Sequence, residues 1–320
     1  MTSAEPLVVA VLDDYQGVAA DCADWSRLGP AADVRFIREH IDDDDRLVET
    51  LKDCHVVVAM RERTPLRADI LGKLDELRLV VTTGMRNASI ERVPGVVFCG
   101  TRGLVSPTVE LTWGLLLAAR RRLITESEAL REGRWQTSIG EGLEGSTLGV
   151  LGLGRIGTRM ARIAAAFGMN VIAYSQNLTE EQAREAGAVR AKSLQALFAD
   201  ADTVTIHLRL SDRTRGLVGA AELDQLGPTG LLVNTSRGEI VDQDALLAAL
   251  RDGRIGGAAL DVYDQEPLPA GHPILSAPRT TLSPHLGYVT RQNYELFFSD
   301  VVEDIEAFIA GKPIRMLEDG

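Results

Sequence analysis

Residues 148–157 read LGVLGLGRIG and contain the pattern G-x-G-x-x-G at Gly152, Gly154 and Gly157. The pattern follows an apolar run, Thr147–Leu151, typical of a buried strand. It opens a segment, Ile156–Phe167, whose apolar residues recur at helical spacing. In such a strand–turn–helix unit the three glycines permit a sharp turn, a close backbone approach to a pyrophosphate, and tight helix–strand packing. The stretch therefore predicts a dinucleotide-binding turn, and the alternative is a glycine-rich turn without a ligand.

The same alternation of strand and helix patterns extends over nearly the whole chain. Apolar runs rich in Val and Ile alternate with segments of helical period, which indicates βαβ units and parallel sheets. The other expected strands are Leu7–Leu12, Val56–Met60, Leu79–Thr82, Val96–Phe98, Asn170–Tyr174, Thr203–Leu208, Gly230–Asn234 and Gly256–Val262. The predicted fold class is α/β, with two blocks of strands and helices.

Two longer helices are expected outside this alternation. One covers Ser106–Leu123, with Ser106 as its cap and Pro107 in its first turn. The other covers Arg291–Ala310 and ends at Gly311, which a proline follows two residues later.

The composition narrows the class of partner. The 320 residues carry a net charge of −12, which argues against nucleic acid or an anionic membrane surface. The acidic run 42–45 is interpreted as a solvated helix start or turn. Cys22, Cys54 and Cys99 lack metal-ligand spacing and indicate reduced thiols. No apolar stretch is long enough for a bilayer, and the N-terminal run lacks the basic residues of a signal peptide. We expect a cytoplasmic soluble protein.

The position that usually selects the cofactor departs from the common fingerprint. An Asp or Glu is expected about 20 residues beyond the glycines, where it would bind the ribose hydroxyls. Here the strand ends in Ser175, Gln176 and Asn177, with neither a carboxylate nor an arginine. The missing carboxylate removes repulsion of a 2′-phosphate, and the missing arginine removes its strongest attractor. We expect use of both NAD and NADP, with a modest lean toward NADP. Arg155 and Ile156, at the helix start, complete the expected cofactor contacts.

Three later motifs follow predicted strands. They read NTSRG at 234–238, DVYDQEP at 261–267 and SPHLGY at 283–288. In a doubly wound sheet, ligands bind beyond the carboxyl ends of the strands. These motifs place Arg237, Glu266 and His285, among other polar residues, in that region. Taken one at a time, each has a plain structural explanation as a surface or loop residue.

Together with the glycine-rich turn, these motifs resemble those of the D-isomer-specific 2-hydroxyacid dehydrogenases, in the same order and spacing over essentially the whole chain. The resemblance implies two Rossmann-like, doubly wound parallel-sheet domains with the active site in the cleft between them. Residues 1–103 with 287–320 would form the substrate domain, and residues 104–286 the dinucleotide-binding domain. It also implies a homodimer formed through the region 106–123 and the loop 133–145.

The resemblance implies a role for each candidate. Arg237 would hold the substrate carboxylate and polarise the keto oxygen. His285 would be the general acid in reduction and the base in oxidation. Glu266 would accept a hydrogen bond from the other ring nitrogen of the histidine. Asp261 would bind the nicotinamide carboxamide, and Thr235 would also contact the cofactor.

Further residues are assigned with less direct support from the motifs. His207 lies inside a predicted strand and is expected to pack near the adenosine end of the cofactor. The next residue but one, Arg209, stands where the family often has proline, which leaves the adenine-side contacts open. Trp135 is expected in the core or an interface, with the active-site cleft as an alternative.

On the substrate side, the loop Thr83, Gly84 and Met85 occupies the place where the family binds the substrate carboxylate through backbone N–H groups. Met85 would narrow the site. Arg61 or Arg63 would bind a second anionic group of the substrate. The alternative is an Arg–Glu–Arg cluster that balances its own charges at the surface.

The expected activity is NAD(P)-dependent hydride transfer to or from a small 2-keto or 2-hydroxy acid, with glyoxylate-like and hydroxypyruvate-like substrates favoured. Formate and phosphite dehydrogenases are rivals within the fold, but formate enzymes carry a neutral amide where this chain has Glu266. An NAD(H)-sensing binding protein is the rival from another class. A purely structural protein would leave the four motifs unexplained.

Overall fold

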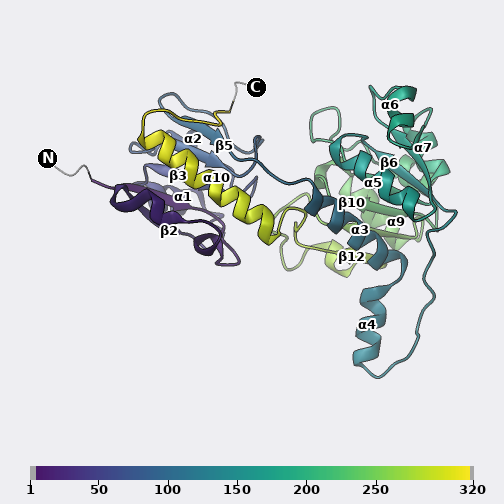
Figure 1. Cartoon of the computed structure of the whole chain (residues 1–320). Helices are drawn as coiled ribbons and strands as arrows, with labels where there is room; N and C mark the ends of the chain where they lie inside the picture. Colours follow the sequence, from purple (N-terminus) through teal and green to yellow (C-terminus); the bar gives the residue numbers. More distant parts are fainter. Residues whose placement is uncertain (1–4, 318–320) are drawn as a thin grey trace. The chain divides into compact units, whose positions relative to one another are not determined.

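The computed structural model describes residues 5–317, and these residues form two parallel β-sheets flanked by helices (Figure 1). The chain divides into two compact units. The first unit runs up to Leu104 and resumes at Val289, and the second unit is Val105–Tyr288. The predicted α/β class with two parallel sheets is confirmed. No helix among the described residues has the length and apolar character that crossing a membrane requires.

The sheet of the first unit has the strand order β2-β1-β3-β4-β5, and every neighbouring pair is parallel. Its middle strands, VVVA and LVVT, are buried at every position, as expected for strands covered on both faces. The strands are β1 (Leu7–Val11), β2 (Ala32–Phe36), β3 (Val56–Ala59), β4 (Leu79–Thr82) and β5 (Val97–Gly100). The helices are α1 (Asp44–Leu51), α2 (Ala68–Leu71) and α10 (Arg291–Ile309).

The last long helix belongs to this first unit although it is far from it in the sequence. Phe297 and Phe298 of α10 are fully buried. The Trp25 ring lies 6.1 Å from the Phe298 ring and 5.3 Å from the Phe36 ring, between centroids. Aromatic contacts of this kind add to the burial of apolar area, so α10 is part of the core of the unit.

The sheet of the second unit has the order β12-β11-β10-β9-β6-β7-β8, again wholly parallel. Its strands are β6 (Thr147–Leu151), β7 (Asn170–Tyr174), β8 (Val189–Arg190), β9 (Thr203–Ile206), β10 (Leu231–Asn234), β11 (Gly257–Leu260) and β12 (Thr280–Leu282). Its helices are α3 (Ser106–Arg120), α4 (Leu123–Arg131), α5 (Arg155–Ala166), α6 (Glu180–Glu185), α7 (Leu194–Asp200), α8 (Ala220–Leu226) and α9 (Gln243–Arg251). From β6 the chain adds β7 and β8 on one side of this strand, and β9 then pairs with β6 on its other side. This reversal of strand order is where such sheets bind ligands.

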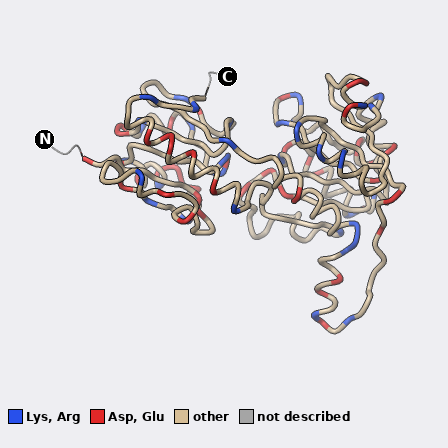
Figure 2. The backbone as a smooth tube through the Cα atoms, viewed as in Figure 1, with Lys and Arg blue, Asp and Glu red and all other residues tan. Residues whose placement is uncertain are grey.

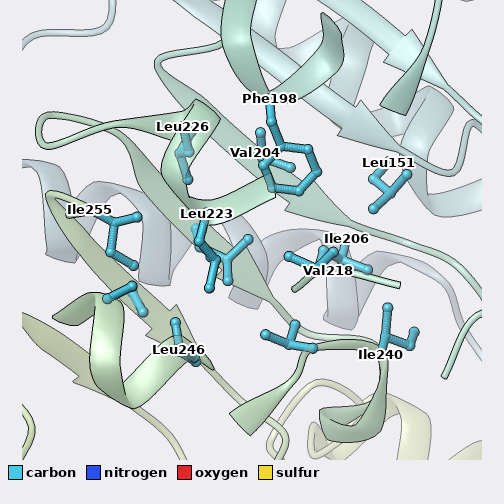
Figure 3. Packing of buried hydrophobic residues seen from close by; sticks show 14 of the residues in the cluster. Leu151, Phe198, Val204, Ile206, Val218, Leu223, Leu226, Ile240, Leu246 and Ile255 are labelled. Atoms are coloured by element: carbon cyan, nitrogen blue, oxygen red, sulfur yellow. The ribbon is translucent and has the colours of Figure 1, made fainter. Parts of the chain in front are cut away.

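The core on one face of this sheet is close-packed. Phe198 of α7 lies against the strand residues Val204 and Ile206, and Leu223 of α8 and Leu246 of α9 complete the layer (Figure 3). All five are almost completely buried. Such a core makes the sheet a rigid base for the loops at its carboxyl edge.

The structure corrects three sequence predictions. The helix predicted to run to Leu123 ends at Arg120, because Arg122 adopts a left-handed conformation with φ of 51° and a separate helix α4 begins. Ser106 is not the cap of α3. Val105 already has helical angles and takes the cap position without a side-chain bond, so the helix starts one residue early. His207 lies after β9, not inside it, since the strand ends at Ile206.

The acidic run 42–45 is a helix start, as predicted. The Asp43 carboxylate accepts a hydrogen bond from the backbone N–H of Arg46 at 2.7 Å, and Asp44 and Asp45 form the first turn of α1. Carboxylates at the N-terminus of a helix accept hydrogen bonds from its free N–H groups. They also interact favourably with the positive end of the helix dipole.

After α10 the chain returns to the edge of the first sheet. The N–H of Leu317 donates to the carbonyl of Phe98 at 2.9 Å, and the Gly100 N–H donates to the Arg315 carbonyl at 3.0 Å. The Arg315 guanidinium donates to Asp304 of α10 at 3.0 Å. Asp304 is completely buried, and this burial raises the pKa of its carboxyl to about 7, against the opposing effect of Arg315.

Asp304→Asn is expected to remove a pH-dependent loss of stability. An aspartate in the unfolded chain titrates near 3.8, so between about pH 4 and pH 7 the folded state binds the proton more tightly. The contribution of Asp304 to stability therefore falls as the pH rises through this range, by up to about 1.4 kcal/mol per pH unit, and stays low above it. Thermal midpoints of the two proteins from pH 4 to pH 8 should diverge in favour of the variant. Glu303→Gln is the control, because this neighbouring carboxylate also accepts a hydrogen bond from Arg315 but is only partly buried. Parallel curves for Asp304→Asn would contradict the burial argument.

Candidate active site

The glycine-rich turn has the geometry that its sequence predicts. Gly152 follows β6 with a φ of 100°, and a Cβ there would come within 2.8 Å of the backbone of His207. A Cβ on Gly157 would lie 2.1 Å from the Gly152 carbonyl oxygen, so helix α5 packs directly on the turn. By contrast, nothing lies within 4 Å of a Cβ placed on Gly154. The turn therefore presents open backbone at Gly154 and the N-terminus of α5, and this fits a dinucleotide pyrophosphate.

A pocket of about 550 Å³ lies beside this turn and is lined by residues that follow β6, β7 and β9. Five of the predicted cofactor residues line it: Gly152, Gly154, Ser175, Asn177 and His207. Arg155 is exposed at the first turn of α5, and Ile156 packs partly against the core. Gly157 is buried in the packing described above. Gln176 accepts a hydrogen bond from Arg213 at 3.2 Å. The structure thus brings the glycine turn and the end of β7 to one pocket.

His207 is a neutral side chain. Burial lowers the pKa of its imidazole to about 3, and its Nε2 lies 2.9 Å from the Thr205 hydroxyl. A histidine with so low a pKa carries no imidazolium proton to donate near pH 7. Its place in the pocket agrees with the expected position near the cofactor.

The turn that carries Arg237 follows β10 and is held in place by hydrogen bonds to the Asn234 side chain. The amide of the buried Asn234 donates to the Arg237 carbonyl at 2.9 Å, and the Ser236 N–H donates to the Asn234 side chain at 3.0 Å. Nη1 of Arg237 donates to the Ser236 carbonyl at 2.7 Å. A Cβ on Gly238 would lie 2.0 Å from the Tyr263 carbonyl carbon. Glycine at 238 is therefore required, and it holds this turn against the loop after β11.

His285 and Glu266 form a pair. The Nδ1 atom of His285 lies 2.5 Å from Oε2 of Glu266, and the other carboxylate oxygen accepts the Tyr263 N–H at 2.9 Å. The imidazole is 23% exposed and the carboxylate 30%. With Nδ1 occupied by Glu266, Nε2 is the ring nitrogen left for a substrate. The residues predicted separately from two motifs are thus brought into direct contact.

Asp261 organises the loop that carries His285. It is completely buried. Its carboxylate accepts hydrogen bonds from Ser283 Oγ at 2.5 Å, Leu286 N at 2.7 Å and Gly287 N at 2.8 Å. Burial raises its pKa, and these hydrogen bonds oppose that rise. His285 itself has a left-handed backbone, with φ of 51°, an uncommon conformation for a side-chain-bearing residue. The loop is held from both flanks of the histidine.

Arg237, Glu266 and His285 follow the adjacent strands β10, β11 and β12 at their carboxyl ends. Thr235, from the same turn as Arg237, is buried and shares a 2.7 Å hydrogen bond with Thr112 of α3. The side chain of Thr235 therefore ties the sheet to α3, which leaves its backbone as the part that a cofactor would meet.

In the first unit, Arg61 lies over the loop 83–85. Its N–H donates to the Thr83 hydroxyl at 2.9 Å, and its Nη1 donates to the Thr83 carbonyl at 3.2 Å. A Cβ on Gly84 would lie 2.0 Å from Nη1, so glycine is required for this approach. The Gly84 N–H donates to Thr101 at 2.7 Å, which leaves the following amides as candidates for an anion. The Met85 side chain is 47% exposed.

The Arg–Glu–Arg cluster separates into two sets of contacts. Nε of Arg61 lies 3.7 Å from a Glu62 oxygen. Arg63 instead donates to the Asp13 carbonyl at 2.7 Å and lies over the Tyr15 ring at 4.4 Å from its centroid. Arg61, and not Arg63, therefore accompanies the predicted carboxylate-binding loop.

Comparison with known proteins identifies the family. A family model described as the NAD binding domain of D-isomer specific 2-hydroxyacid dehydrogenases matches residues 113–287. The chain belongs to the D-isomer specific 2-hydroxyacid dehydrogenase family. A glyoxylate reductase of Aeropyrum pernix is 40% identical over 258 residues, which are 76% of this chain and 77% of that protein. A glycerate dehydrogenase of Methylorubrum extorquens is 32% identical, covering 86% and 88%. A crystal structure of a phosphoglycerate oxidoreductase from Vibrio cholerae superposes with a TM-score of 0.90 at 36% identity, covering 95% and 99%.

As a member of this family, the protein is an NAD(P)-dependent oxidoreductase of 2-hydroxy acids, and this confirms the predicted reaction class. Several residues around the dehydrogenase site were missed by sequence reasoning. The pocket is also lined by Thr158, Arg162, Leu178, Gln182, Glu185, Ala186, Leu208 and Arg209. Thr158 and Arg162 could have been found, since they follow Gly154 at steps of four along one helix face. Ser283 belongs to the motif SPHLGY, but its hydrogen bond to Asp261 had no local signal, because the two residues are 22 positions apart.

Proposed function

We propose that this dehydrogenase reduces small 2-keto acids of the glyoxylate and hydroxypyruvate type to D-2-hydroxy acids, with Arg237, His285 and Glu266 as catalytic residues. The observation that carries the proposal is the 2.5 Å contact between His285 and Glu266 on loops next to that of Arg237. The names of the relatives, glyoxylate reductase and glycerate dehydrogenase, support the substrate class.

Each side chain has a distinct task in this proposal. The Arg237 guanidinium binds the substrate carboxylate and the keto oxygen through forked, charged N–H donors. Nε2 of His285 donates a proton to that oxygen during reduction and takes it back during oxidation. Glu266 fixes the ring through Nδ1 and balances the charge of the imidazolium. The nicotinamide ring, when bound, supplies or accepts the hydride.

The remaining predicted contacts complete the proposed site. Gly152, Gly154, Arg155, Ile156 and Gly157 would bind the pyrophosphate through backbone N–H groups and the α5 N-terminus. The residues proposed toward the rest of the cofactor are Ser175, Gln176, Asn177, His207, Thr235 and Asp261. Because both Asp261 oxygens already accept protein hydrogen bonds, its main proposed effect is to position His285.

On the first unit, we propose that the loop of Thr83, Gly84 and Met85 meets the substrate carboxylate. Arg61 would meet a second polar or anionic group of the substrate. Its guanidinium donates to the Thr83 carbonyl and therefore lies beside this loop. The exposed Met85 side chain would limit the size of the substrate substituent.

The proposal is tested by following absorbance at 340 nm with NADH and NADPH in parallel against glyoxylate, hydroxypyruvate, pyruvate and a bulkier 2-keto acid. Turnover with glyoxylate and hydroxypyruvate above that with pyruvate and the bulkier acid would support the substrate class. Dinucleotide binding without turnover on any 2-keto acid would refute the catalytic proposal and favour a sensing role. Turnover restricted to the bulkier acid would refute the substrate class alone.

We further propose that the enzyme is a homodimer formed through the arm, defined as α4 and the segment 132–145, which stand out from the body of the second unit (Figure 1). Within this segment, residues 135–140 carry no charged side chain (Figure 2). Trp135 is 76% exposed and Ile139 is 87% exposed, so Trp135 is not a core residue in the chain. The arm is ordered by Glu126, whose carboxylate accepts hydrogen bonds from Thr137 at 2.7 Å and Ser138 at 2.6 Å. Large apolar side chains on an ordered, exposed arm fit a partner surface.

The double variant Trp135→Ser with Ile139→Ser is expected to shift the dimer to a monomer, because it removes the two most exposed large apolar side chains of the arm. Light scattering coupled to size exclusion measures the mass directly. Leu275→Ser, at a 49% exposed leucine outside the arm, is the matched control and should leave the mass unchanged. A parent protein of about 35 kDa, the mass of one chain, would refute the dimer.

We also propose a cytoplasmic location. The support is chemical: Cys22, Cys54 and Cys99 are buried free thiols. Burial raises the pKa of Cys54 to about 11 and that of Cys99 to about 12, so these thiols are poorly nucleophilic. Such cysteines suit a reducing compartment.

A further inference from the structure

The loop after β9, residues 207–215, carries three arginines and reaches the end of β7. Nη1 of Arg213 donates to the Gln176 side chain at 3.2 Å and links the two strand ends. Hydrogen bonds within the loop fix its conformation. The Thr214 hydroxyl accepts a hydrogen bond from the Ser211 N–H at 2.8 Å and donates one to the Arg209 carbonyl at 2.6 Å. These bonds fix the backbone of Arg209 at the edge of the pocket described above, which Arg209 lines.

The charges of this pocket are unbalanced. Its charged lining residues are Arg162 of α5, Arg209 of the loop and Glu185 of α6, so two arginines line the pocket with one acidic residue. Ser175 lines the same pocket. It stands directly after β7, where dinucleotide-binding sheets meet the ribose hydroxyls. A substituent on the ribose 2′-oxygen would therefore lie in the pocket that contains both arginines.

We propose that this pocket is a 2′-phosphate site and that it makes the enzyme prefer NADPH, with Arg209 as the main specificity-determining residue. Arg162 and the Ser175 hydroxyl complete the site. The charge that such sites usually take from an arginine at the end of the second strand comes here from the loop after β9, one strand beyond the glycine turn. A phosphate monoester carries up to two negative charges, and guanidinium groups bind it through paired donors. This inference rests on the proposed function, because it assigns the cofactor of that same site.

Glu185 would weaken the preference of the pocket for a 2′-phosphate. Its carboxylate lines the pocket with the two arginines and would repel a phosphate. Glu185→Gln should therefore tighten binding of a 2′-phosphate without affecting ligands that lack one. This second variant tests the charge argument in the opposite direction, so a loss of folding in one variant does not leave the proposal undecided.

The test is calorimetric titration of the full chain with adenosine 2′,5′-bisphosphate and with 5′-AMP, which differ only in the 2′-phosphate and need no turnover. The parent protein should bind the bisphosphate at least about tenfold more tightly, the factor expected for one charged hydrogen-bonded contact. Arg209→Gln should remove most of that difference and leave 5′-AMP binding unchanged. Arg215→Gln is the matched control: it lies in the same loop, and Nη1 of Arg215 lies 3.8 Å from a Glu239 oxygen.

Equal affinity of the parent for the two nucleotides would overturn the proposal, and so would an Arg209→Gln variant that still discriminates. Failure of this inference is distinct from failure of the proposed function. An enzyme that binds 5′-AMP and reduces a 2-keto acid with NADH, but ignores the 2′-phosphate, contradicts only the inference. A protein that binds neither nucleotide contradicts both.

Discussion

His285→Asn is expected to lower kcat for 2-keto acid reduction by about 10²- to 10⁴-fold, the range for loss of a positioned general acid. The geometry supports a large effect. Nδ1 of the ring is 2.5 Å from Glu266, and Asp261 accepts hydrogen bonds from the backbone N–H groups of His285 and Leu286. Asparagine keeps a polar side chain of similar reach but cannot deliver a proton. The dinucleotide affinity should be unchanged, because His285 is not among the residues that line the pocket at the glycine turn.

The measurement compares steady-state kcat with dinucleotide binding for the parent and variant. Glu266→Gln is the companion variant: it preserves a hydrogen-bonding partner and removes the charge, so kcat should fall by less than in His285→Asn. A ranking in which Glu266→Gln is the more damaged enzyme would mean that the carboxylate acts on the substrate directly. An unchanged kcat in His285→Asn would exclude this histidine as the acid.

The parts of the site that could be predicted from the sequence are those that local rules determine. The glycine turn between β6 and α5 required only the spacing of Gly152, Gly154 and Gly157, because the strand, turn and helix are consecutive. The candidate residues Arg237, Glu266 and His285 follow from the resemblance to the family's motifs, and parallel pairing places residues that follow neighbouring strands on one edge of a sheet.

The rest depends on contacts between distant segments. The anchoring of the His285 loop by Asp261 joins residues more than 20 positions apart, and periodicity gives no signal for such a contact. Arg209 lines the pocket because β9, which precedes its loop, is paired with β6 on the side opposite β7. The prediction of Ser106 as the helix cap was wrong for a similar reason. The backbone of Val105 is already helical, and the general preference for serine at a cap contains no information on the preceding residue.

Arg237→Ala is expected to lower kcat/KM by about 10³-fold or more, because it removes a charged donor from both the carboxylate and the oxygen on which negative charge develops. The effect should appear in KM as well as in kcat, since the carboxylate is bound in the ground state and in the transition state alike. Arg237→Lys should recover only part of the loss. A lysine keeps the charge but presents no planar fork to two oxygens.

Kinetics of the three enzymes with one keto acid, at saturating cofactor, separate these effects. We expect both Arg237 variants to stay folded, because Asn234 donates its hydrogen bond to the backbone carbonyl of residue 237 and not to its side chain. Unchanged dinucleotide binding verifies this. Loss in kcat alone, with KM preserved, would show that Arg237 acts only on the developing oxyanion, and the substrate carboxylate would then be bound by the loop at Gly84. Lysine activity equal to that of arginine would show that charge suffices and that the forked geometry is not required.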